Sequence, residues 1–139
     1  MPPAWAARYV GIPFQDKGRD RDGLDCYGLL RLVLLERFTI ALPTYTEGYV
    51  TATDRQEIAA LLTEGREADG SWVTVTDPKP GDGILFRLKG APTHVGVVAE
   101  PPWFLHVARG MATVLERWDR PKWAHRILGF YRHERMRAA

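Results

Sequence analysis

The sequence predicts an α+β fold in which helices precede a small antiparallel sheet along the chain. Up to Gly65, apolar residues recur at helical spacing, whereas after Gly83 short β-rich segments are separated by Gly and Pro. Helices followed by strands, without regular alternation, are typical of α+β domains rather than of parallel α/β folds. We therefore expect the N-terminal helices to pack on one small antiparallel sheet.

The composition is that of a single globular domain covering residues 1–139. Of the 139 residues, 45% are hydrophobic and 26% are charged, which is close to the average of folded proteins. The net charge is +2 and Lys and Arg form no run, so we expect no nucleic-acid partner. The N-terminal MPPAWAARYV lacks the basic start and apolar region of a signal peptide, and we expect no membrane span.

Three helices are expected before the sheet. A short helix over residues 4–10 follows two prolines, and the turn-rich GIPFQDKGRDRDG after it predicts a surface loop. A central helix begins at Cys26, because apolar residues at positions 29, 30, 33 and 34 follow helical spacing. A further helix starts at the capping box of residues 53–56 and ends at Gly65.

The second half of the chain contains five predicted strands, at residues 84–88, 94–99, 103–108, 113–117 and 127–132. The second and third of these are joined through Glu100, Pro101 and Pro102, and prolines favour a turn because they cannot continue a ladder. We therefore expect an antiparallel meander that contains this hairpin.

Cys26 is the only cysteine, so the chain cannot form an intramolecular disulfide or a C-x-x-C zinc site. A free cysteine is usually a small buried hydrophobe, which is the ordinary interpretation. A thiol in the first turn of a helix, however, lies near unpaired backbone N–H groups that favour the nucleophilic thiolate. Gly28 in the same turn is unfavourable for a helix and indicates close packing or substrate approach, and Asp25 suits an N-cap.

Two of the four histidines, His94 and His106, lie inside apolar strands, where a polar ring needs a partner. If the turn between the strands has an odd number of residues, both rings point to the same face and lie within reach of a mutual hydrogen bond. A turn of even length would separate them, and two unrelated histidines are the alternative. His125 and His133 lie beside arginines, and we expect both to be solvated.

Four segments resemble a known family. GLDCYGLL is similar to the D-C-x-G-[LV] nucleophile motif of NlpC-type cell-wall cysteine peptidases, and KPGDGILF is similar to the strand that follows it in that family. THVGVV resembles the family's segment with the catalytic histidine, and FLHV resembles the strand with its third residue. The four occur in the family's order over residues 11–108. The resemblance implies a papain-like fold with the nucleophile at a helix N-terminus.

Residue by residue, the resemblance implies that Cys26 is the nucleophile, His94 the general base and acid, and His106 the orienting residue. It also implies that the backbone N–H of Cys26 contributes to the oxyanion hole. Asp25 matches an aspartate that binds the free amine of the stem peptide in some members, although N-capping explains it equally well. No cofactor and no metal are implied.

The chain also departs from the family pattern. Phe14 stands where many members have a tyrosine whose hydroxyl helps to shape the oxyanion site, and Tyr27 replaces the usual small residue after the cysteine. DCYGLLRLV followed by LPTYTEGY is similar to the branch found in phage tails and gene transfer particles. The resemblance thus implies a chain made in the bacterial cytoplasm, assembled with tail or baseplate proteins, and acting in the periplasm or cell wall of the target cell.

The leading hypothesis is a cysteine endopeptidase that cuts amide bonds in peptidoglycan peptides through an acyl-enzyme. The alternative keeps the fold and drops the chemistry: a structural hub or plug subunit of a tail, suggested by Phe14 and Tyr27. A zinc site built from Cys26, His94 and His106 is a third interpretation. An acyltransferase or deamidase on the same fold is a fourth, because it shares the nucleophile.

Overall fold

The computed structural model describes residues 3–42, 72–88 and 91–137. Its helices are α1 (Ala4–Ala7), α2 (Cys26–Phe38), α4 (Pro121–Ala124) and α5 (Glu134–Arg137). The helix predicted to end at Gly65 lies outside the described residues. No described helix has the length and apolar character needed to cross a bilayer.

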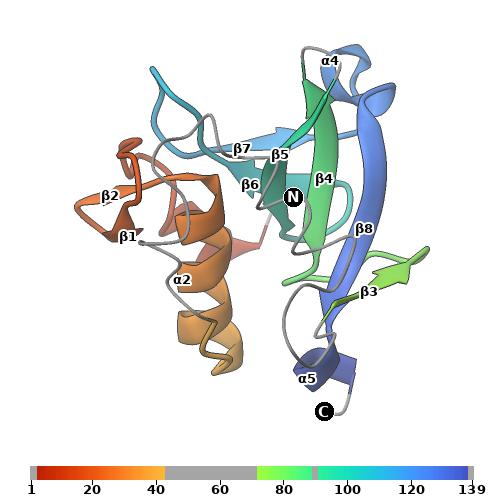
Figure 1. Ribbon diagram of the computed structural model, residues 1–139, viewed down its shortest axis with the longest axis horizontal. Helices are drawn as coiled ribbons and strands as arrows, with labels where there is room; N and C mark the ends of the chain where they lie inside the picture. The colour runs from red at the N-terminus through yellow and green to blue at the C-terminus, as the bar shows by residue number, and fades with distance from the viewer. Residues whose placement is uncertain (1–2, 43–71, 89–90, 138–139) are drawn as a thin grey trace.

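A single antiparallel sheet organises the second half of the chain (Figure 1). Its strands, in spatial order, are β3 (Trp72–Val75), β8 (Ile127–His133), β4 (Gly83–Leu88), β5 (Ala91–Val98), β6 (Trp103–His106) and β7 (Val114–Arg117). Strands β4 to β7 form the predicted meander, and β8 returns to pair with β4 on its other side. The predicted α+β class with an antiparallel sheet is confirmed.

Several predicted boundaries differ from the structure. Helix α1 ends at Ala7 rather than at residue 10. The predicted surface loop before Asp25 contains two short paired strands, β1 (Arg19–Asp20) and β2 (Gly23–Leu24). The strand β3 was not predicted, and neither were the four-residue helices α4 and α5.

Two hydrophobic clusters lie on opposite faces of the sheet, because side chains alternate along each strand. The larger cluster joins α2 to β5, the strand on which this helix packs, through residues such as Leu29, Val33, Val95 and Val97. The smaller cluster is closed by α4, and its fully or almost fully buried members are Ile84, Phe86, Val98, Phe104 and Trp123. Figure 1 shows α2 on one side of the sheet and α4 beside the end of β4.

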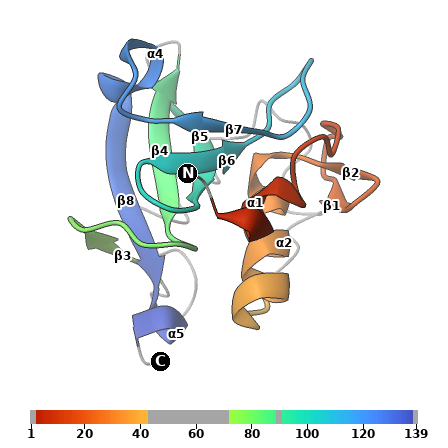
Figure 2. The ribbon, with the colours of Figure 1, turned by 180° about the vertical axis from the view of Figure 1, so that it is seen from behind.

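The N-terminal segment is anchored against both α2 and the sheet. In Figure 2, α1 lies beside α2, and the buried Tyr9 after it donates a hydrogen bond to Glu36 of α2 at 2.8 Å. Further along, Pro13 forms a β-bridge with Ala112 in the connection between β6 and β7. This pairing holds the loop that delivers the chain to α2.

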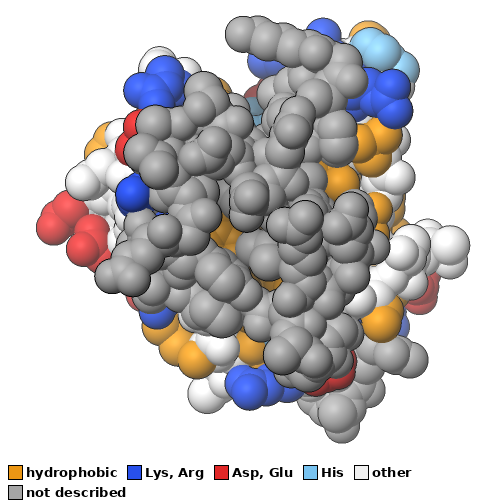
Figure 3. Space-filling model, viewed as in Figure 1, with side chains coloured by type: hydrophobic (Ala, Val, Ile, Leu, Met, Phe, Trp, Pro, Cys, Tyr) orange, Lys and Arg blue, Asp and Glu red, His pale blue; other side chains and the backbone are white. Residues whose placement is uncertain are grey.

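On the face shown in Figure 3, the described Lys and Arg side chains lie at separate points around the edge. His125 is exposed, as predicted. The prediction for His133 was wrong: it is 6% exposed, its ring meets that of Trp72 edge-on at 5.2 Å, and its Nδ1 accepts a hydrogen bond from the backbone N–H of Arg135.

Candidate active site

The N-terminus of α2 is fixed by its cap. Asp25 is buried, and its Oδ1 accepts a hydrogen bond from the backbone N–H of Gly28 at 2.7 Å, as an N-cap does. The same oxygen forms an ion pair with Arg19 at 2.8 Å. The predicted capping role of Asp25 is therefore confirmed, and its carboxylate is bound at both the helix and the preceding hairpin.

Gly28 is required by close packing. A Cβ atom built on Gly28 would lie 2.0 Å from the carbonyl oxygen of Gly18, which is in the loop before β1. That loop therefore presses directly on the first turn of α2, where Cys26 is the first helical residue. Cys26 is 2% exposed.

The register of the β5–β6 hairpin brings two histidines together. Val97 pairs with Leu105 and Val98 with Phe104, and the N–H of Ala99 donates to the carbonyl oxygen of Trp103. The loop is therefore the three residues 100–102, so His94 and His106 point to the same face on diagonal positions. Nε2 of His94 lies 3.0 Å from Nδ1 of His106. The predicted contact between the imidazoles is confirmed.

A third side chain extends this pair, and sequence reasoning missed it. Glu116 lies on β7 opposite Phe104, which places it diagonally from His106 on the same face. Its Oε2 is 2.5 Å from Nε2 of His106, and its Oε1 accepts a hydrogen bond from Nε1 of Trp123 at 3.2 Å. Its position depends on the register of the β6–β7 hairpin, and the longer connection between these strands gives no sequence signal comparable to the two prolines of the β5–β6 turn.

Aromatic rings enclose the two histidines. The ring of Trp123 stacks at 19° on that of His94, and the ring of Phe104 stacks at 26° on that of His106. Phe86 packs against His94 from the neighbouring strand. His94 and His106 are 1% and 2% exposed, so their hydrogen bonds lie in an environment of low dielectric constant.

Burial dominates the electrostatics of His106. It lowers the pKa of the imidazole below its usual value, although the hydrogen bond and the charge of Glu116 act in the opposite direction. For Glu116, burial raises the pKa, but hydrogen bonds from His106 and Trp123 outweigh it and the net pKa is lowered. Near neutral pH the site therefore contains a neutral His106 beside an ionised Glu116.

The structure places the predicted residues in two groups. His94 and His106 contact each other, and the ring of His94 packs on Trp123 in the smaller cluster. Cys26 belongs to the larger cluster, together with Val95 on the strand that carries His94. Helix α2 packs on β5, so the helix that begins at the cysteine lies on the strand of the predicted base.

The two departures from the family pattern lie beside the start of α2. Phe14 is half-buried, with the guanidinium of Arg109 5.2 Å from its ring centre. Tyr27 is 3% exposed, and the guanidinium of Arg19 lies 5.3 Å from its ring centre. Both aromatic rings therefore pack beside cations, and Phe14 forms a β-bridge with Leu24, two residues before Cys26.

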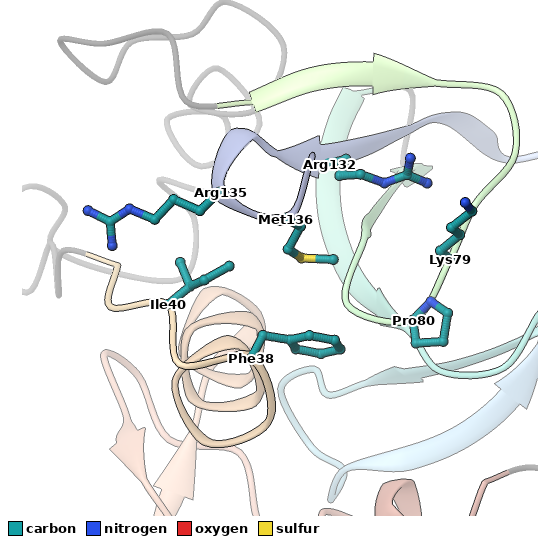
Figure 4. Close-up of a pocket in the computed structure, with 7 residues that line it drawn as sticks. All are labelled: Phe38, Ile40, Lys79, Pro80, Arg132, Arg135 and Met136. Atoms are coloured by element: carbon teal, nitrogen blue, oxygen red, sulfur yellow. The ribbon is translucent and has the colours of Figure 1, made fainter. Parts of the chain in front are cut away.

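The described residues form a pocket away from Cys26 but no metal-binding cluster. Within the described ranges, no group of three or more His, Cys, Asp or Glu side chains is arranged to hold a metal ion. A pocket of about 550 Å³ lies between the end of α2 and α5, where Phe38, Pro80 and Met136 provide apolar walls and Lys79 and Arg135 provide positive charge (Figure 4). It is roughly 18 Å along the helix axis from Cys26, at about 1.5 Å per residue.

Two relatives are similar to most of this chain. The chain is 24% identical over 120 residues to the murein DD-endopeptidase MepS/murein LD-carboxypeptidase of Escherichia coli K12, covering 86% of the chain and 55% of that protein. It is 25% identical over 118 residues to a probable endopeptidase of Haemophilus influenzae, covering 84% of the chain and 63% of that protein. The chain thus spans a little over half the length of these relatives.

Solved structures show the same fold. The NlpC/P60 domain of the peptidoglycan hydrolase SagA superposes with a TM-score of 0.54 at 23% identity, covering 82% of this chain and 84% of that one. A lipoprotein-like NLP/P60 protein of Staphylococcus aureus superposes with a TM-score of 0.60 at 21% identity, covering 92% of this chain and 38% of that one. The papain-like fold implied by the sequence is confirmed.

A family model also matches most of the chain. The NlpC/P60 family model matches residues 11–132, which include the start of α2, both buried histidines and Glu116. This range extends from the loop before α2 to the last strand of the sheet. The chain belongs to the NlpC/P60 family.

Proposed function

We propose that this chain is a cysteine endopeptidase that hydrolyses amide bonds in peptidoglycan peptides, with Cys26 as nucleophile, His94 as general base and acid, and His106 as orienting residue. The observation that carries the proposal is the buried contact of 3.0 Å between Nε2 of His94 and Nδ1 of His106. Because this contact engages Nε2, the other ring nitrogen of His94 is the one that serves the thiol. The names of MepS and SagA as murein and peptidoglycan enzymes support the substrate class.

The reaction is an acyl transfer in two halves. The proton of the Cys26 thiol moves to Nδ1 of His94, and the thiolate attacks the carbonyl carbon of the amide. His94 then gives this proton to the leaving nitrogen, the C–N bond breaks, and a thioester remains. Water next gives a proton to His94 while its oxygen attacks the thioester carbon. Cleavage of the C–S bond releases the carboxylic acid, and Cys26 takes the proton back.

Two further groups have roles in this proposal. The backbone N–H of Cys26, at the start of α2, donates to the developing oxyanion, where the helix dipole also favours negative charge. Asp25 binds the free amine of the stem peptide with the carboxylate that also caps the helix and pairs with Arg19. An Asp25→Asn variant that kept the fold but bound amine-free and amine-bearing peptides alike would support this role.

The first test compares variants on purified murein fragments. We expect Cys26→Ala and His94→Ala to reduce product formation by about a thousandfold or more, because the nucleophile and its base act as a unit. His125→Ala is the matched control, since it removes an exposed imidazole, and it should retain wild-type activity. Equal product from the wild type and Cys26→Ala would overturn the enzymatic proposal.

A second candidate function is favoured by one observation. Cys26 is 2% exposed and has the bulky Tyr27 beside it, which suits a catalytically inactive hub or plug subunit on the same fold. The pH dependence of alkylation by iodoacetamide separates the two, because the thiolate is the reactive form and an ordinary thiol has a pKa of about 8.5. Rapid alkylation well below pH 8, lost in His94→Ala, supports the peptidase. An unreactive thiol over this range supports the plug.

We also propose that a phage-like tail carries this domain to the cell wall of a target cell. The support is the similarity of DCYGLLRLV and LPTYTEGY to the branch of the family found in phage tails and gene transfer particles. Mass spectrometry of tail particles purified from the producing bacterium should find the chain together with baseplate proteins. Its absence from the particles would overturn this route of delivery and leave the peptidase proposal intact.

A further inference from the structure

We propose that Glu116 is a positioning residue that sets the direction of the hydrogen-bond chain through His106 and His94, so that Nδ1 of His94 is the basic nitrogen. The catalytic consequence rests on the proposed function above, whereas the proton positions themselves do not. Glu116 is outside the four motifs that carry the family resemblance.

The surroundings of Glu116 require a group that only accepts hydrogen bonds. Trp123 Nε1 donates to Oε1 at 3.2 Å, and the ammonium group of Lys122 lies 4.0 Å from the same oxygen. Oε2 faces Nε2 of His106 at 2.5 Å. An ionised carboxylate has no proton to donate, so Nε2 of His106 must carry the proton in this contact.

The direction of the hydrogen bond between His106 and His94 depends on the charge of His106. An imidazolium at this position would be buried among aromatic rings with Lys122 nearby, and burial lowers the pKa of His106. A neutral His106 with its proton on Nε2 has a lone pair on Nδ1. That lone pair can only accept, so Nε2 of His94 is the donor across the 3.0 Å contact. A neutral His94 therefore carries its proton on Nε2 and is basic at Nδ1.

Substitution of Glu116 by glutamine should reverse the donor and acceptor roles along this hydrogen-bond chain, because it adds a donor without changing the shape of the side chain. In Glu116→Gln, the N–H of Trp123 continues to select an oxygen, so the amide NH₂ turns toward His106. Nε2 of His106 must then accept, its proton moves to Nδ1, and His94 accepts at Nε2. The proton of His94 is thereby moved to Nδ1, the nitrogen that the proposed mechanism needs as a base.

The direct test reads the proton positions by ¹⁵N NMR of the imidazole nitrogens, in the full chain at a pH where the rings are neutral. Signals are assigned by comparison with His94→Gln and His106→Gln. In the wild type we expect protonated-type Nε2 and unprotonated-type Nδ1 on both rings. In Glu116→Gln we expect the two types to exchange on both rings. Wild-type rings with the opposite tautomers, or no change in a folded Glu116→Gln, would overturn the proposal.

The matched control is Asp119→Asn, which removes a carboxylate three residues further along, where it is exposed and paired with Arg117. It should leave the imidazole signals unchanged. If Glu116→Gln does not fold, the wild-type spectrum alone decides between the two tautomers.

Activity provides a second readout. On murein fragments, Glu116→Gln should lower kcat by about ten- to a hundredfold with little change in KM, as loss of an outer-shell partner does. Trp123→Phe removes the donor that orients the amide, so in Glu116→Gln/Trp123→Phe the amide oxygen can turn toward His106. The loss of kcat caused by Glu116→Gln should therefore be smaller in the Trp123→Phe background than in the wild type. If Cys26→Ala shows that the wild type is not a peptidase, the proposed function fails while the NMR result still stands.

Discussion

The ionisation of His106 couples the stability of the fold to pH. Because burial lowers the pKa of its imidazole below the usual 6.5, the unfolded chain binds this proton more readily than the folded one. The contribution of His106 to stability is therefore fully present above about pH 6.5 and is lost as the pH falls below it. Glu116, whose pKa is also lowered from 4.5, acts in the same direction in a more acidic range.

We expect the free energy of unfolding to fall as the pH drops from 7.5 to 5.5, and to fall less steeply in His106→Gln. One titrating group contributes at most about 1.4 kcal/mol per pH unit to the slope of the unfolding free energy against pH. The slope measured for His106→Gln should therefore be smaller than that of the wild type by up to this value. Urea denaturation followed by tryptophan fluorescence at several pH values measures both slopes. His125→Gln, at an exposed position, is the control and should follow the wild type. Equal slopes for His106→Gln and the wild type would contradict this assignment.

The residue-level predictions succeeded where one local feature decided the outcome. The two prolines favoured a turn between their strands, and the contact between His94 and His106 then required only that this turn have an odd number of residues. Glu116 required the register of a second hairpin, whose longer connection carries no comparable signal. His133 was predicted to be solvated because of its arginine neighbours. In the structure β8 is an interior strand, and Trp72 of β3 covers His133. No sequence pattern predicted β3.

At the level of single elements, the first turn of α2 depends on a glycine that helix propensity disfavours. Replacing glycine by alanine inside a helix ordinarily stabilises it by about 1 kcal/mol. Gly28→Ala should instead destabilise the protein by about 1 to 3 kcal/mol, because the new methyl group would lie 2.0 Å from the carbonyl oxygen of Gly18, a backbone atom that cannot turn aside. Chemical denaturation of the variant measures the change.

The control for Gly28→Ala lies on the same helix. Leu35 is 40% exposed, so Leu35→Ala alters α2 away from the contact with the loop and should cost well under 1 kcal/mol. A stabilised Gly28→Ala would mean that the loop around Gly18 can move away from α2. The packing explanation for this glycine would then be wrong.

Elements were predictable in proportion to their length and periodicity. Helix α2 has thirteen residues and a regular apolar spacing, and its predicted start at Cys26 is confirmed. Strands β1 and β2 have two residues each, too few for an alternation of side chains to appear. The four-residue β3 is defined mainly by pairing with β8, a partner more than fifty residues away along the chain, so local sequence could not identify it.

For the whole molecule, the order of helical and β-rich segments predicted the class of fold. It did not predict where the last strand joins the sheet. Strand β8 lies between β3 and β4, so the last strand of the chain completes the sheet between two earlier ones. A buried ion pair fixes this arrangement: both carboxylate oxygens of Asp82 accept from the guanidinium of Arg132, at 2.9 and 2.8 Å. Asp82 is 0% exposed and ends the turn that leads into β4, where its backbone N–H donates to the carbonyl oxygen of Lys79.

We therefore expect Asp82→Asn to destabilise the entire fold rather than to loosen one strand. The amide cannot accept from both guanidinium nitrogens and from the backbone N–H of Lys79, which now donates to Oδ2 at 2.8 Å, so a donor is left facing a donor. The cost should be about 2 kcal/mol, as for lost hydrogen bonds to a buried charge.

Asp119→Asn, which breaks an exposed pair with Arg117, should leave the urea midpoint unchanged. Fluorescence and circular dichroism should give one coincident, lowered midpoint for Asp82→Asn, because β8 touches β3 and β4 at once. Two separate transitions would show instead that the C-terminal strand opens on its own and that the pair between Asp82 and Arg132 does not hold the sheet closed.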